Sequence, residues 1–276
     1  MITPRKLKST LRAKLDERKF QQVPKAVCDT ANLMRLRESD VKRMLARERF
    51  EDEWVGVLES TEPFSISPAG GGVNEGDRRI LYQIVRSCNA LNVLEIGTHI
   101  GASTLHIAAA LRRNAGILGR PCSIRTVDIV DVNASSGPHA NLGCSHTPKA
   151  MLEEAGLLDF VEFAVTRAQD AMSTASERFN VIFLDGDHSP AAVYAEIPLA
   201  LKLLDKEGIV ILHDYFPNGE PIWPGRKPLL GPYMAVQRHL REGADFQVFP
   251  VGEVGWSTKL GSRKSSLAIL ARPADL

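Results

Sequence analysis

The segment VLEIGTHIGASTL, residues 93–105, runs from a short apolar stretch through a turn with two glycines into a stretch with helical spacing. The apolar stretch predicts a buried β-strand. Gly97 and Gly101 permit a tight turn with a close backbone approach, and Ser103 or Thr104 can cap the helix that follows. A nicotinamide-binding loop needs a middle glycine where this sequence has histidine, which disfavours a dehydrogenase.

Beyond this segment, short apolar stretches alternate with amphipathic stretches of helical length. Such alternation predicts an α/β fold with a doubly wound, mostly parallel sheet. The last two strand candidates have no helix between them, so we expect an antiparallel hairpin at the sheet edge. The seven strand candidates are residues 92–97, 123–128, 161–165, 180–185, 208–214, 245–251 and 266–271. The helix candidates between the first five are residues 102–113, 148–156, 168–176 and 190–204.

Length and composition indicate a globular protein that folds without disulfides or metal staples. The chain has 276 residues, of which 44% are hydrophobic and 24% are charged, and it contains no apolar run long enough to span a membrane. Its four cysteines are widely spaced and show no metal-ligand pattern. The start of the chain has no secretory signal, so we expect a cytoplasmic protein.

The N-terminal region differs in charge from the rest of the chain. Residues 1–49 hold fourteen Lys or Arg against six Asp or Glu, although the whole chain has a net charge of only +1. Leu7, Leu11 and Leu15 recur at helical spacing among these bases, which predicts an amphipathic helix rather than a nucleic-acid tail. A second helix is expected over residues 39–60.

A stretch rich in Gly, Pro and Ser follows these predicted N-terminal helices. It marks a boundary between a helical extension, residues 1–69, and a main domain, residues 70–276. Extra N-terminal helices of this kind often pack against a second subunit, so we expect a homo-oligomer, most simply a dimer.

The glycine turn resembles the first motif of the class I S-adenosylmethionine (SAM) dependent methyltransferases, E/D-x-G-x-x-x-G, which Glu95 to Gly101 match in full. A second acid, Asp128, ends the next strand, where the family binds the ribose hydroxyls. The resemblance implies a Rossmann-like methyltransferase fold, SAM as cofactor, and a bound adenine near residues 166–172. The cofactor residues it implies are Val73, Asn74, Glu95, Gly97, Thr98, Gly101, Ser103, Thr104, Asp128, Ala168, Gln169 and Asp185.

Acids and histidines follow the fourth and fifth predicted strands, in the sequences DGDHS (185–189) and HDY (213–215). If these strands are neighbours, about 4.8 Å apart, Asp185 and Asp214 share a pocket. Two carboxylates there would repel each other unless a cation such as Mg²⁺ or Ca²⁺ lay between them.

This pattern resembles a bacterial subgroup of the family that methylates small molecules, including sugar hydroxyls, and the related catechol and caffeoyl-CoA O-methyltransferases. The resemblance implies that Asp185 and Asp214 bind Mg²⁺ and that His188 is the general base. The sequence departs from the metal-dependent pattern at one place, because His213 and Tyr215 flank Asp214 where another oxygen ligand is usual. Two alternatives therefore stay open: a metal-free site using His188 or His213, and a structural role for the acids.

The acceptor is expected to be a small molecule covered by the segment YFPNGEPIWPGRKPLLGPYM, residues 215–234. Its prolines and glycines predict an irregular lid, and its aromatic residues Tyr215, Trp223 and Tyr233 are candidate substrate contacts, unless they only cover the sheet edge. The sequence lacks the N/D-P-P-Y run of base-directed methyltransferases, which disfavours nucleic-acid substrates.

The function expected from the sequence is thus metal-assisted O-methylation of a natural product or sugar. The alternatives are a metal-independent O- or N-methyltransferase and a non-catalytic SAM-binding protein.

Overall fold

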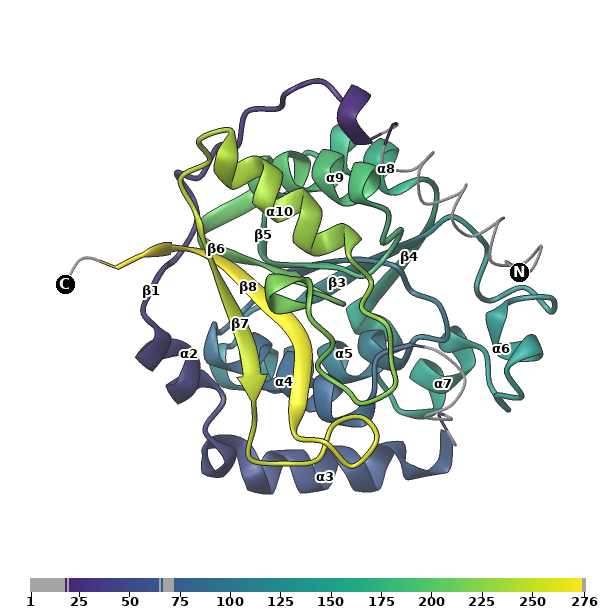
Figure 1. Ribbon diagram of the computed structural model, residues 1–276. Coiled ribbons are helices and arrows are strands. Elements are labelled where there is room, and N and C mark those ends of the chain that lie inside the picture. Colours follow the sequence, from purple (N-terminus) through teal and green to yellow (C-terminus); the bar gives the residue numbers. More distant parts are fainter. Residues whose placement is uncertain (1–17, 19, 65, 67–71, 275–276) are drawn as a thin grey trace.

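The computed structural model describes residues 18, 20–64, 66 and 72–274 and shows three layers, with helices on both faces of a central sheet (Figure 1). The helix expected around Leu7 to Leu15 lies outside the described residues. One face carries α2 (Glu38–Met44), α3 (Glu51–Thr61), α4 (Glu75–Ser87), α5 (Ala102–Leu118) and α7 (Pro148–Glu154), and the other carries α8 (Ala168–Thr174), α9 (Pro190–Leu203) and α10 (Gly231–Arg241). A short α6 (Pro138–Asn141) lies in the connection after β3.

The sheet has eight strands rather than the predicted seven, in the order β1-β8-β6-β5-β2-β3-β4, with β7 paired to β8. The additional strand, β1, spans only Arg35–Leu36 and pairs with the end of β8. Two residues are too few to show a period of two, so this strand could not be predicted from local periodicity. The strands are β1 (Arg35–Leu36), β2 (Asn92–Ile96), β3 (Ser123–Asp128), β4 (Val161–Val165), β5 (Phe179–Leu184), β6 (Leu204–Leu212), β7 (Gln247–Glu253) and β8 (Lys264–Pro273).

The α/β class and the antiparallel hairpin are confirmed. Strands β2 to β6 are mutually parallel where they pair, whereas β8 is antiparallel to both β6 and β7. Successive residues of β5 point to opposite faces, as a strand requires: Phe183 is buried with α4 and α5, and Ile182 with α9 and α10. Both faces of this central strand are thus covered, which explains its continuous apolar sequence.

The single helix expected over residues 39–60 is wrong. The chain forms α2, a 3₁₀ turn over Arg47–Phe50, and then α3. The break between the two helices is stabilised by a residue of α4. The Arg79 guanidinium donates to the Arg47 carbonyl at 3.1 Å and to Glu51 Oε2 at 2.5 Å. Such a contact between distant segments is invisible to a local periodicity. The division at residue 69 stays a prediction, although β1 joins the N-terminal part to the main sheet.

The segment 215–234 is irregular only as far as Leu230. A helix, α10, begins at Gly231, with Pro232 in its first turn, where a missing N–H costs nothing. Tyr233 therefore lies on a helix and not in a lid, which corrects the prediction for the end of this segment.

The central strand supplies a test of the fold. Ile182 is fully buried in the middle of β5, so Ile182→Ala should lower the free energy of unfolding by about 2–5 kcal/mol, measured by urea denaturation. Ile117 on α5 is 65% exposed, and Ile117→Ala, the matched control, should change it by no more than about 0.5 kcal/mol. Equal losses in the two variants would contradict the described burial.

Candidate functional site

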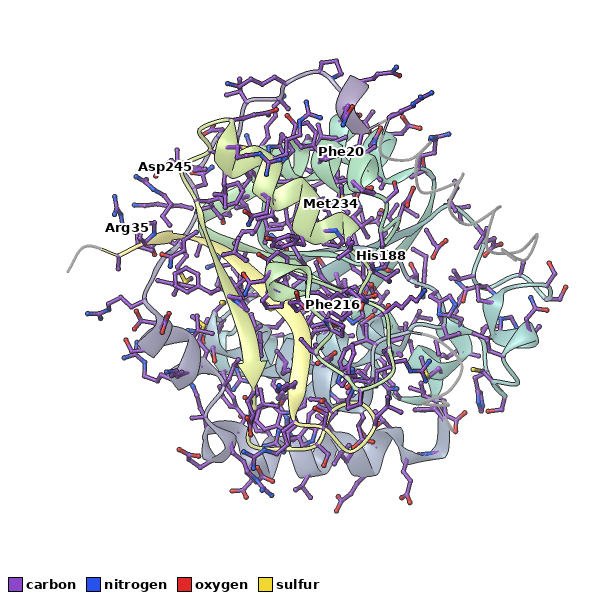
Figure 2. The ribbon with its side chains drawn as sticks, in the orientation of Figure 1. Phe20, Arg35, His188, Phe216, Met234 and Asp245 are labelled. Carbon is purple, nitrogen blue, oxygen red and sulfur yellow. The ribbon has the colours of Figure 1, made fainter. Side chains whose placement is uncertain are left out.

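A cavity of about 670 Å³ opens at the carboxyl ends of β2, β3, β4, β5 and β6. This is where open α/β sheets bind ligands. The start of α10 lies against it, because a Cβ on Gly231 would come within 1.8 Å of the His188 carbonyl oxygen. Figure 2 shows His188 below Met234 of α10 and above Phe216.

The glycine turn passes directly over the end of β5. Gly97 has φ +98°, and a Cβ there would lie 2.2 Å from the Asp185 carbonyl oxygen, so no side chain fits. Its N–H donates to the Val127 carbonyl at 2.8 Å. Gly101 has φ +74°, and a Cβ on it would meet Pro148 at 2.8 Å. Both glycines are thus required by conformation and by space.

The Glu95 side chain turns into the core instead of the cavity. Its Oε2 accepts hydrogen bonds from Thr104 Oγ1 at 2.5 Å and from Thr126 Oγ1 at 2.6 Å. Burial raises the pKa of Glu95 to about 7 against the opposing effect of these hydroxyls. Thr98 is also buried and shares a hydrogen bond with Thr126 at 2.6 Å. These residues fasten the turn to β3, a positioning role.

The caps proposed for α5 are wrong, since Gly101 is its N-cap residue and no side chain caps it. Ser103 and Thr104 are buried inside the first turn of the helix. None of Glu95, Thr98, Gly101, Ser103 or Thr104 is among the residues lining the cavity, so their contact with a cofactor stays a prediction.

Asp128, Ala168 and Gln169, which are predicted to bind the cofactor, line the cavity. Asp128 accepts hydrogen bonds from the backbone N–H groups of His99 at 2.9 Å and Val130 at 3.1 Å, which fixes its carboxylate at the end of β3. Its position suits hydrogen bonds to two neighbouring hydroxyls.

Val73 and Asn74 are near the cavity but do not line it, whereas their neighbour Gly72 does. Val73 is buried, and Asn74 caps α4 by accepting a hydrogen bond from the Asp77 N–H at 3.1 Å. The Asn74 side chain also donates to Asp77 Oδ2 at 2.5 Å. Asn74 thus orients an acid that the sequence did not single out.

Four side chains converge where β5 and β6 end: Asp185, His188, His213 and Asp214, here called the acid–imidazole cluster. Asp185 Oδ1 lies 2.8 Å from His213 Nδ1 and 3.2 Å from His188 Nε2. Asp214 Oδ2 lies 3.4 Å from His188 Nε2 and 3.8 Å from His213 Nδ1. The pairing of β5 with β6 brings the two acids together, as the sequence predicted.

The cluster perturbs its own ionisation. Burial alone would raise the pKa of Asp185, but His213 and His188 outweigh burial and lower that pKa to about 2. Burial opposes protonation of both histidines, yet the charges of Asp185 and Asp214 raise the pKa of His188 and raise that of His213 further. Without a bound cation, the cluster therefore favours carboxylates facing imidazolium rings.

Two acids of the site were missed from the sequence. Asp77 is fully buried in the first turn of α4, with Oδ2 3.7 Å from His213 Nε2. Glu196 is 3% exposed and lines the cavity from α9, and burial, with the charge of Asp187, raises its pKa to about 8. Glu196 lies between Val193 and Ile197 on the buried face of α9, a signal that helical periodicity could have revealed.

The aromatic residues proposed as substrate contacts are not among those lining this cavity. Tyr215 and Trp223 are 5% and 4% exposed, and they pack against Tyr233 and Phe216 with ring centroids 6.0 and 5.8 Å apart. Their arrangement favours the alternative, aromatic cover for the sheet edge. Lys259, which lines the cavity, lies 5.1 Å from the centre of the Trp223 ring.

The layers, the mostly parallel sheet with the antiparallel pairing of β8 to β6, and the cavity over the glycine turn define the Rossmann-like fold of class I methyltransferases. Solved structures share it. The O-methyltransferase TomG of Streptomyces achromogenes, in complex with SAM, superposes with a TM-score of 0.53 at 18% identity over 86% of this chain and 96% of its own. An O-methyltransferase of Bacillus cereus in complex with SAH gives 0.52 at 20% identity over 95% of this chain and 97% of its own.

Sequence comparison narrows the class. Residues 94–215 match the model of a methyltransferase domain family. The rhamnosyl O-methyltransferase of Mycobacterium tuberculosis is 32% identical over 152 residues, covering 53% of this chain and 54% of that protein. The catechol O-methyltransferase of Niastella koreensis is 26% identical over 154 residues, 54% of this chain and 57% of that protein. The chain thus matches little more than half of these relatives, and the resemblance to class I SAM-dependent methyltransferases is confirmed.

The close approach of Gly97 to β5 generates a prediction. Gly97→Ala should weaken SAM binding at least about tenfold in calorimetry, because the methyl group must push the turn away from Asp185. Gly143 also has a positive φ, +69°, but a Cβ there meets nothing within 4 Å. Gly143→Ala therefore places a side chain at a positive φ without the clash and should leave SAM affinity within about twofold. Equal affinities in the two variants would contradict the steric argument.

The shifted pKa values predict how stability depends on pH in metal-free protein. The raised pKa of His188 and His213 makes their contribution complete below about pH 6.5 and progressively lost as pH rises through the folded values. The lowered pKa of Asp185 makes its contribution complete above about pH 3.9 and lost as pH falls toward 2. The free energy of unfolding, from urea titrations in EDTA, should therefore decrease between pH 6.5 and 9. His188→Gln should flatten that decrease, and parallel profiles would contradict the coupling.

Proposed function

We propose that this protein transfers the methyl group of SAM to a hydroxyl of a small molecule. The supporting observation is that one cavity contains both the candidate cofactor residues, Gly97 and Asp128, and the acid–imidazole cluster. A methyl donor and a group able to deprotonate an acceptor hydroxyl are thereby held in one space, which is what in-line transfer requires.

Different residues of the cavity bind the cofactor and deprotonate the acceptor. Asp128 accepts hydrogen bonds from the ribose hydroxyls, and the turn at Gly97 lets the cofactor approach the backbone closely. Ala168 and Gln169 form the adenine side of the cavity. His188 is the general base, because its side chain is 25% exposed and can pass the proton to solvent.

A divalent cation fits the donor atoms of the cluster. Asp185, His188 and His213 each offer one ligand atom, and these atoms lie within 4.8 Å of one another, with Asp214 Oδ2 beside them. We propose that Asp185 and Asp214 hold the cation, for which Mg²⁺ is the ion implied by the family resemblance. When bound, it would lower the pKa of the acceptor hydroxyl, and by neutralising the carboxylates it would leave His188 a better proton acceptor.

For the acceptor we propose a sugar or natural-product hydroxyl, since the relatives named above are a rhamnosyl and a catechol O-methyltransferase. We further propose that the protein is a cytoplasmic homodimer that binds neither nucleic acid nor membrane. Among the described residues, no helix combines the length and apolar character of a membrane span.

His188→Gln should lower kcat for methyl transfer by about 10²–10⁴, because proton removal from the acceptor is lost, while SAM affinity changes by less than about threefold. The assay measures SAH formation on a panel of rhamnosides and catechols, and calorimetry measures SAM binding. Asp185→Asn should behave in the same way.

His146→Gln, in a loop whose residues do not line the cavity, is the matched control and should keep wild-type activity. Full activity of His188→Gln or Asp185→Asn would refute the assigned roles. Activity that survives EDTA treatment and gains nothing from added Mg²⁺ would favour the metal-free alternative, and SAM binding without turnover on any acceptor would favour a non-catalytic protein.

A further inference from the structure

A buried acid lies behind His213, on the side opposite the acid–imidazole cluster. Asp77 Oδ2 lies 3.7 Å from His213 Nε2, and the Asp77 side chain is fully buried. The Asn74 side chain donates to the same oxygen at 2.5 Å, and the Asp77 N–H donates to Asn74 Oδ1 at 3.1 Å. A fixed carboxylate beside one ring nitrogen determines the direction in which the other ring nitrogen points.

The other nitrogen, Nδ1, points at the strand-end acids. It lies 2.8 Å from Asp185 Oδ1 and 3.8 Å from Asp214 Oδ2. Yet His213 is 9% exposed, and neither ring nitrogen makes an aligned hydrogen bond among the described residues. The His213 Nδ1 is thus buried and close to two carboxylates, but it is aligned with neither for a hydrogen bond. This is the arrangement expected of three groups that bind a common cation.

The His188 Nε2 also approaches Asp185 and Asp214 without an aligned hydrogen bond, but His188 differs from His213 in its exposure and in having no acid behind its ring. Its side chain is 25% exposed, against 10% for His213, and only its Nε2 lies within 4 Å of acids in the described part of the chain. With no carboxylate on Nδ1, its ring is free to release a proton to solvent. The two histidines are thus suited to different tasks.

We propose that His213 is the third protein ligand of the cation held by Asp185 and Asp214, and that Asp77 is the positioning residue that aims it. This rests on the proposed function only in sharing its cation site. A carboxylate behind a metal-binding imidazole fixes the tautomer and the ring orientation. Because one of the three donors is nitrogen, the site prefers ions such as Mn²⁺ or Co²⁺ over Mg²⁺, which favours oxygen alone.

The test uses full-length metal-free protein, titrated with MnCl₂ and with MgCl₂ in a calorimeter. Wild type should bind Mn²⁺ at least about tenfold more tightly than Mg²⁺. His213→Asp converts the donors to oxygen and should reduce this preference at least about fivefold. Asp77→Asn should weaken Mn²⁺ binding about 10–100-fold. His188→Gln, the matched imidazole control, should not weaken Mn²⁺ binding.

A spectroscopic readout separates ligation from indirect effects. Electron spin echo modulation of the Mn²⁺-loaded protein should show imidazole nitrogen coupling in wild type, in Asp77→Asn and in His188→Gln, and should lose it in His213→Asp. Retained SAH binding shows that each variant is folded, and His213→Gln serves in place of any His213→Asp protein that fails this check.

Mg²⁺ binding as tight as Mn²⁺ binding in wild type, or nitrogen coupling that survives His213→Asp, would overturn the proposal. These binding readouts do not depend on turnover. Methyl transfer can therefore fail on every acceptor tested, which would refute the proposed function, while the assignment of His213 is judged separately.

Discussion

The contact between the glycine turn and the end of β5 determines the rest of the site. The Asp185 N–H donates to the Ile96 carbonyl at 2.8 Å, and the next residue, Gly97, passes so close to the Asp185 carbonyl that only hydrogen fits at its α-carbon. The Gly97 N–H donates in turn to Val127 of β3. Three strand ends are thus joined by backbone contacts alone. The part of the cavity lined by Gly97 and Asp128 therefore cannot move away from the part lined by Asp185 without breaking hydrogen bonds between buried strands.

Glu95, in β2, and Asp185, directly after the neighbouring strand β5, have pKa values shifted in opposite directions by their surroundings. Glu95 faces threonine hydroxyls in the core, where burial raises its pKa to about 7. Asp185 faces imidazoles, which outweigh burial and lower its pKa to about 2. Glu95 therefore acts as a structural hydrogen-bonding group, whereas Asp185 stays ionised and can bind a cation. Their chemistry is set by what the neighbouring strand and helix present and not by residue type.

The sequence was informative wherever a signal was local. Alternating apolar stretches located the seven longer strands, and the motif from Glu95 to Gly101 located the glycine turn beside the cavity. It failed where the cause lay elsewhere in the chain. The direction of the Glu95 side chain depends on Thr126, and the break before α3 depends on Arg79. From the sequence, the aromatic residues of the segment 215–234 are candidates for substrate contacts, but in the structure they pack against one another.

Helix α4 shows how the N-terminal region bears on the chemistry. On one side, Arg79 and Arg86 pair with Glu51 and Glu53 of α3. On the other, the Trp256 ring N–H donates to the Gly76 carbonyl at 3.0 Å, and a Cβ on Gly76 would lie 2.4 Å from the Ser257 carbonyl oxygen.

The first turn of α4 is thus clamped between the N-terminal helices and the connection from β7 to β8, and that turn carries Asp77. Since Asp77 Oδ2 lies 3.7 Å from His213 Nε2, the N-terminal helices and the β7–β8 connection help to place an acid beside the acid–imidazole cluster. Lys259, in the same connection, lines the cavity. The segments outside residues 94–215 therefore help to shape the site. They support Asp77, which lies beside His213, and they contribute Lys259 to the lining of the cavity.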